Sequence, residues 1–322
     1  METHVVPAAP ARRSTRAGAL GLVLFAAIFA AALSWAKWTP YLHKLQGIRA
    51  TRAWPGHDLL AKAGAAHSAP SLHGAWAFTW AYAGAVWPAL VAALLIGAAL
   101  EALVPRRWLL RVVDRRSCLG GSVAGGLLAL PSLMCTCCTA PVAASLRRTG
   151  ASTSATLAYW LGNPVLNPAV LAFLALVAPW QWVATRAIAG VVLVFAATAV
   201  VARFLGDGRT PRPREVVEEL PRRVPVRFGA ALARLSVTLL PEYAVVVFLV
   251  GLFRGWLFPF DGGAAHWGVA TGVQGALLIS LPAISVVSAA MVVRTLSVRV
   301  TLAAAAAVVA VSVGAGILLT VL

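Results

Sequence analysis

Apolar residues occur along this chain in long uninterrupted runs, separated by shorter basic or polar segments. A helix of a soluble protein carries an apolar stripe on one face, and these runs do not have that pattern. They reach the about 20 residues that an α-helix needs to cross a bilayer. The runs are Ala17–Ala36, Trp80–Leu103, Ala151–Ala178, Trp182–Leu205, Ser236–Phe258 and Thr301–Leu322. Because nothing alternates with the period of two that a membrane β-barrel requires, we predict an all-α polytopic membrane protein.

Composition and charge agree with this prediction. Hydrophobic residues make up 60% of the chain and charged residues 11%, which is outside the range of soluble globular proteins. The net charge of +17 comes mainly from basic residues between the apolar runs. That distribution indicates basic loops on the cytoplasmic side and contact with anionic lipid, and it argues against a nucleic-acid partner. We expect a multi-pass protein of a bacterial cytoplasmic (inner) membrane.

The start of the chain permits two interpretations. Arg12, Arg13 and Arg16 followed by Ala17–Ala36 resemble the basic and apolar regions of a secretory signal peptide. The apolar core of a signal peptide has about 7–15 residues, and this run is longer. We therefore favour an uncleaved first helix.

The segment Cys118–Arg148 is expected to enter the membrane without crossing it. It is too short for two crossings of about 20 residues each, and basic residues stand at both its ends. Its interior contains residues that break or weaken helices: Gly120, Gly121, Gly125, Gly126, Pro131 and Pro141. We predict a re-entrant hairpin with cytoplasmic ends and its tip near Pro131–Pro141 at membrane depth. Such backbone persists only where protein or a watery cavity shields it from lipid.

The second half of the chain resembles a faded copy of the first. Trp87-Pro88 and Leu240-Pro241 each precede an apolar helix, and Leu277–Arg294 resembles Leu127–Arg148. Counting crossings gives these helices opposite directions, which predicts two inverted repeats with broken helical hairpins. The total would be about 7–9 transmembrane or re-entrant helices. This count places Arg294 on the outer side and the C-terminus in the cytoplasm.

The predicted organisation has five parts. Residues 1–36 form the N-terminal tail and first helix, and 37–79 an outer loop. Residues 80–205 form the first repeat, 206–229 a polar cytoplasmic linker, and 230–322 the second repeat.

Three cysteines form the most informative local cluster. Cys135, Cys137 and Cys138 lie within four residues of broken backbone, with Met134 before them. Thiols are soft ligands that suit Cu(I), Zn(II) and thiophilic metalloids, so these three are candidate metal or metalloid ligands on a solute path. The alternative is that small, moderately apolar cysteines simply pack well there.

Other polar residues at membrane depth are candidates for the same path. Asn163 and Asn167 lie one helical turn apart beside Pro164 and Pro168, and buried amides either line a cavity or bond neighbouring helices. Ser285 and Ser288 occupy the equivalent broken segment of the second half, with the same two interpretations. Glu101 and Glu242 are candidates for proton coupling. The alternatives are that Glu101 snorkels to a nearby cytoplasmic helix end and that Glu242 is favoured by the dipole of a helix start. No Walker-type or dinucleotide motif occurs, so the sequence indicates no ATP motor and no cofactor.

Residues Leu130 to Leu171 resemble the predicted permeases that include the organoarsenical-efflux permeases. The matching positions, in the order and spacing of that family, are Cys135, Cys137, Pro141, Arg147, Arg148, Gly150, Pro164, Asn167 and Pro168. The resemblance implies a duplicated helical permease that exports small solutes, with trivalent organoarsenicals as the best-known substrate class. Cys138 stands where the family usually has glycine, which can change what is bound.

Two functions follow from these observations. The first is a permease for a small thiophilic solute, an organoarsenical, metalloid or metal species, which would give resistance by efflux and is not an enzyme. The second is a membrane thiol–disulfide oxidoreductase that uses the pair Cys135 and Cys138. Such enzymes usually relay electrons between two cysteine pairs, and only Cys118 is left for a second. A homo-oligomer is compatible with either function.

Overall fold

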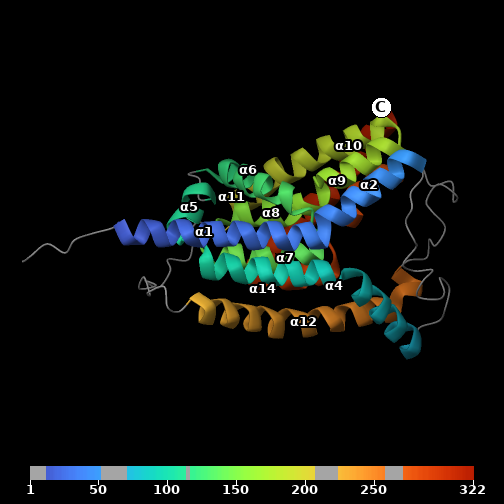
Figure 1. Ribbon diagram of the computed structural model, residues 1–322. Coiled ribbons are helices and arrows are strands. Elements are labelled where there is room, and N and C mark those ends of the chain that lie inside the picture. Colours follow the sequence, from blue (N-terminus) through green and yellow to red (C-terminus); the bar gives the residue numbers. More distant parts are fainter. Residues whose placement is uncertain (1–11, 52–70, 114–116, 207–223, 258–270) are drawn as a thin grey trace, which may run out of the picture.

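The computed structural model describes residues 12–51, 71–113, 117–206, 224–257 and 271–322 (Figure 1). Every regular element in these ranges is helical. The first half contains α1 (Arg12–Leu33), η1 (Ser34–Trp38), α2 (Thr39–Thr51), α4 (Leu72–Leu103), α5 (Arg106–Val113), α6 (Cys118–Ala129), η2 (Leu130–Ser132), α7 (Thr136–Arg148), α8 (Thr153–Val165), α9 (Pro168–Val177), α10 (Trp180–Val191), η3 (Val192–Ala197) and α11 (Thr198–Leu205). The second contains α12 (Val224–Leu257), α13 (Thr271–Ala283), α14 (Val286–Thr295) and α15 (Val298–Val321).

The predicted helical membrane protein is confirmed. Within the described ranges, six helical segments are long and apolar enough to cross a membrane, and the bent pair α13–α14 makes a seventh. The six are Gly18–Thr51, Leu72–Leu103, Thr153–Val177, Trp180–Leu205, Val224–Phe253 and Val298–Val321. Each contains most of one of the apolar runs identified in the sequence.

The first span is longer than the sequence suggested. Residues 37–79 were expected to be a loop, but helix continues through η1 and α2 to Thr51, and α4 begins at Leu72. The helix continues because α2 packs on α9, and hydropathy along the sequence does not predict this contact. The rings of Tyr41 and Phe173 meet edge to face at 5.8 Å, and Ile48 is fully buried.

Neighbouring long helices run antiparallel. Gly21 of α1 packs against the backbone of Leu103 at the end of α4. Gly97 of α4 packs against Leu235 near the start of α12, and Gly251 near the end of α12 packs against Phe78 near the start of α4. The end of α4 and the start of α12 therefore share one end of the bundle with the first turns of α1 (Figure 1).

That shared end carries ionic contacts, and we call it the basic end. Glu101 of α4 pairs with Arg234 of α12 and, at 3.5 Å, with Arg148 of α7. It also accepts a 2.9 Å hydrogen bond from Ser145. Glu101 therefore links α4, α7 and α12 at this end of the bundle, which gives it a structural role.

The segment Cys118–Arg148 is a re-entrant hairpin, as predicted. α6 runs parallel to α8, because Gly121 lies against Ser154 and Gly126 against Gly162. α7 runs back, since Thr139 contacts Trp160 whereas Arg147 bonds Ala151 just before α8. Both ends of the hairpin are thus at the start of α8, and its tip is near the middle of the span Thr153–Val177. The glycines make this possible, because a Cβ at Gly125 would lie 2.1 Å from the Ala155 oxygen.

The corresponding segment of the second half has a different shape. α13 and α14 are bent by 57°. Gly272 at the start of α13 packs near Thr320 and Gly316 at the end of α15, while α14 leads directly into the start of α15. α13 and α14 therefore form one bent span antiparallel to α15. Pro282 bends the chain here, whereas the first hairpin reverses at Leu133, whose φ of 49° is left-handed.

The predicted position of the C-terminus is consequently wrong. Because α13–α14 crosses the membrane, α15 ends at the face opposite the basic end, and Figure 1 shows the C-terminus far from the start of α1. α4 and α12 do run in opposite directions, as the repeat comparison predicted. An inverted-repeat relation between the complete halves stays a prediction.

Reporter fusions at the two ends of the chain test this topology. A reporter before Arg12 and a second one after Leu322 should report opposite sides of the membrane, because the described residues give seven crossings when α13–α14 is one bent span. A fusion in the linker between α11 and α12 should agree with the first reporter. Agreement of both terminal reporters would contradict the crossing by α13–α14.

Candidate solute site at the hairpin tip

Three thiols converge at the tip of the re-entrant hairpin. After η2 the chain turns at Leu133, Cys135 directly precedes α7, and Cys137 and Cys138 lie in its first turn. The Sγ of Cys135 is 3.0 Å from that of Cys137 and 3.2 Å from that of Cys138, and the three lie within 4.8 Å of one another. Sulfurs bound at about 2.3 Å to one atom are at most about 4.6 Å apart. The three sulfurs are thus close to a common coordination geometry.

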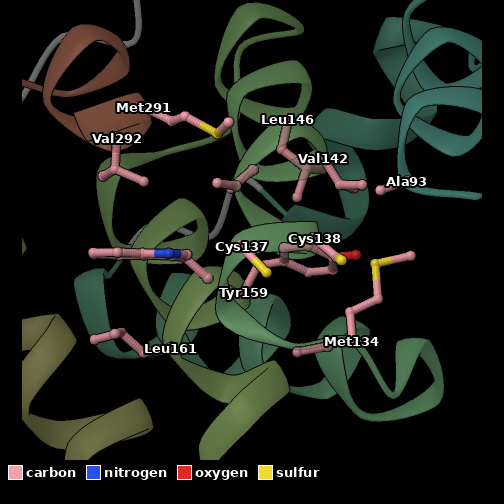
Figure 2. Close-up of a cluster of buried hydrophobic side chains, with 14 of the residues drawn as sticks. Ala93, Met134, Cys137, Cys138, Val142, Leu146, Tyr159, Leu161, Met291 and Val292 are labelled. Atoms are coloured by element: carbon pink, nitrogen blue, oxygen red, sulfur yellow. The ribbon is translucent and has the colours of Figure 1, made fainter. Parts of the chain in front are cut away.

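The surroundings of the thiols are apolar, which suits soft ligands. Cys138 is fully buried, Cys137 nearly so, and Cys135 is half-buried and the most accessible of the three. Figure 2 shows Cys137 and Cys138 within a cluster that includes Met134, Val142 and Tyr159. The N-terminal end of α7 favours negative charge at these positions, because its first backbone N–H groups lack helical partners.

Asn163 fixes the tip of the hairpin from α8. Its side-chain oxygen accepts a 3.3 Å hydrogen bond from the Met134 backbone N–H, and its amide nitrogen donates to the Tyr159 carbonyl at 2.9 Å. Ser132 and the Tyr159 hydroxyl are joined at 3.1 Å. Asn163 is fully buried, so its observed bonds are those of a residue that positions the thiols.

Asn167 lies at the break between α8 and α9 and caps α9. Its side-chain oxygen accepts from the Ala169 and Val170 N–H groups at 3.0 and 3.4 Å, as the N-cap of α9. It is also buried. These contacts correspond to a structural role, which the sequence analysis gave as the alternative to lining a cavity. Exposure of either asparagine to a solute path stays a prediction.

The break in the second half lies beside the hairpin tip. The Thr136 hydroxyl donates to the Pro282 carbonyl. Ser285 and Ser288 form a reciprocal cap at the start of α14, in which each side chain accepts the other's backbone N–H at 3.2 Å. The predicted serines therefore begin the helix that follows the Pro282 break, and their hydroxyls are engaged in capping. A role for them in solute contact is untested.

Cys118 and Glu242 have other surroundings. Cys118 stands at the start of α6, at the opposite end of that helix from the tip. Glu242 pairs with Arg294 at 3.2 Å.

Sequence reasoning missed the contribution of the first helix. Trp38 in η1 donates its indole N–H to the Pro131 carbonyl at 2.9 Å, which ties this helix to the hairpin. Lys37 lies close enough to the three clustered cysteines to interact electrostatically with their thiolate forms, and its ammonium lies 5.5 Å from the centre of the Tyr41 ring. Placing Lys37 in a loop concealed its proximity to the thiols. The signal that could have revealed it is the position of Lys37, directly after the apolar run Ala17–Ala36 and next to Trp38.

Tyrosines from the two long antiparallel helices also face the site. Tyr82 of α4 and Tyr243 of α12 have ring centres 6.1 Å apart, and both lie near Cys137 and Cys138. The thiols thus lie among η1, α4, α8 and α12, and their chemistry is that of a soft-ligand site with Lys37 nearby.

Comparisons with known proteins agree with this architecture. A family model described as "predicted permease" matches residues 71–220, which include the hairpin and both asparagines. The UPF0718 protein YraQ of Escherichia coli (strain K12) is 37% identical over 264 residues, covering 80% of this chain and 74% of the relative. No solved structure matches this chain. The extent of this likeness shows that the chain belongs to a family of predicted membrane permeases.

Proposed function

We propose that this protein exports a small thiophilic solute across a bacterial cytoplasmic membrane, and that the solute binds the three thiols. The observation that carries the proposal is the convergence of three Sγ atoms within 4.8 Å on broken backbone at membrane depth. Irregular backbone of this kind is typical of transport paths. Membership of a permease family supports transport, and the resemblance to organoarsenical-efflux permeases supports export.

The thiols suit trivalent metalloids and soft metal cations. A trivalent arsenic centre with three hydroxyls would form three S–As bonds while three As–O bonds break, and the three thiol protons would leave with the hydroxyls as water. A centre that carries one organic group would use two thiols and release two waters. A divalent cation would displace three protons and form a complex with one negative charge. The third thiol, Cys138, therefore widens the range of centres that the site can fully coordinate.

Thiol–disulfide exchange is the second candidate function. The 3.2 Å separation of the Cys135 and Cys138 sulfurs favours it, since this pair is close enough to join with a small movement. An electron relay needs a second pair, and Cys118, at the far end of α6, is the only other cysteine of the chain. Transport is therefore the better supported function.

Serine substitutions separate the two functions. Cys135→Ser and Cys137→Ser should each reduce thiophilic-solute flux into inverted vesicles at least about tenfold, because a hydroxyl is a poor ligand for soft centres. Cys118→Ser is the matched control and should transport normally. Loss in Cys135→Ser and Cys138→Ser with Cys137→Ser unaffected would favour the oxidoreductase. Normal flux in every variant would refute a thiol site.

Lys37 should determine which charge the bound complex can have. Lys37→Met removes the cation that offsets a negatively charged divalent-metal complex in an apolar site, so it should weaken Cd²⁺ binding about tenfold or more. Arsenite binding, which gives a neutral complex, should change little. Thiolate–metal absorbance of purified protein measures both, with Lys44→Met as the control. Equal weakening of both ligands would show that Lys37 acts only through packing.

A further inference from the structure

Arg186 is a buried cation that the proposed function does not use. It lies in α10 within the span Trp180–Leu205 and is 5% exposed. An arginine remains charged in a protein, and a charge at membrane depth is costly unless it is compensated. In the described part of the chain, no ion pair with a carboxylate compensates Arg186.

Its partners are two backbone carbonyls, one from each half of the chain. The guanidinium donates through Nη1 to the Leu278 oxygen and through Nη2 to the Pro164 oxygen, both at 2.8 Å. In a continuous helix each oxygen would accept the N–H of the residue four positions later. Those residues are Pro282 and Pro168, which have no N–H. Arg186 therefore supplies the hydrogen-bond donors that the two prolines lack.

The electrostatics of the two broken segments favour a cation at this point. Pro164 is in the last turn of α8, and Leu278 is in the C-terminal half of α13. Helix C-termini carry partial negative charge, so two of them face the guanidinium. In broken-helix transporters, freed carbonyls and half-helix C-termini coordinate a mobile cation. Here the guanidinium occupies the equivalent environment.

The same two breaks contact the thiol hairpin. Thr136 bonds the Pro282 carbonyl, and Asn163, one residue before Pro164, bonds Met134. The Thr139 hydroxyl lies 3.5 Å from the Trp160 oxygen, which Pro164 deprives of its helical donor. A displacement of either break would therefore also displace the residues around Cys135, Cys137 and Cys138.

We propose that Arg186 is a positioning residue, a cation of the protein itself that joins the proline break of α8–α9 to that of α13–α14. By joining them it fixes the segments that pack around the thiol cluster. It acts through backbone carbonyls and not through the solute. This inference goes beyond the proposed function, and its test does not require that any solute be transported.

Restoring one missing N–H provides a sharp test. On a Cys118→Ser background, Arg186→Gln should loosen both breaks and raise the rate at which a membrane-permeant maleimide modifies the remaining thiols about tenfold or more, because bonds to a charged donor are lost. It should also lower the thermal unfolding temperature. Adding Pro282→Ala should recover much of both effects, because residue 282 lies within α13 and its new N–H points to the Leu278 oxygen.

Pro168→Ala is the matched control. α8 ends at Val165, and Asn167 has the non-helical ψ of 113°, so a new N–H at 168 should not reach the Pro164 oxygen. Pro168→Ala should therefore not rescue Arg186→Gln. If Arg186→Gln does not fold, Arg186→Lys with and without Pro282→Ala gives the same comparison, since an ammonium lacks the fork that bridges both carbonyls.

Three results would overturn the proposal. The first is unchanged labelling in Arg186→Gln. The second is failure of Pro282→Ala to rescue, and the third is equal rescue by both proline substitutions. If the thiols prove not to bind a solute, labelling and unfolding still decide the role of Arg186.

Discussion

The structure depends on one constraint: backbone polar groups at membrane depth have no water to bond. Prolines and loop residues interrupt the helices in both halves, and each interruption leaves carbonyls or N–H groups without helical partners. Side chains from other helices meet several of them. Asn163 accepts from the Met134 N–H, Trp38 donates to the Pro131 carbonyl, and Arg186 donates to one carbonyl in each half. These bonds also decide which segments lie together.

This constraint explains why the thiols are where they are. A regular helix spaces successive side chains by 100°, so residues 135 and 138 would share one face and residue 137 would point away from residue 135. Because Cys135 is still extended and α7 begins only at Thr136, the three sulfurs approach one another. The irregular backbone therefore creates the soft-ligand cluster, and its supporting bonds keep the cluster in place.

The sequence predicted much of this arrangement, because long apolar runs and basic flanks report directly on membrane crossing. The hairpin followed from its length, its glycines and prolines, and its basic ends. The sequence did not reveal whether a proline break reverses the chain or only bends it. That difference depends on the left-handed backbone of Leu133 in one segment, and no described non-glycine residue of α13–α14 has a comparable φ. Lys37 and Arg186 were also missed, since each lies near a residue that is about 90 or more positions away along the chain.

The central claim is that one soft centre binds three thiols at the hairpin tip. Arsenic K-edge X-ray absorption of the purified Cys118→Ser protein loaded with arsenite measures the ligands of the bound atom directly. The account predicts sulfur neighbours alone, three per arsenic, with loss of stoichiometric binding when Cys137 is replaced by serine. Arsenic surrounded by oxygen, or sulfur coordination that persists after Cys135, Cys137 and Cys138 are all replaced, would contradict it.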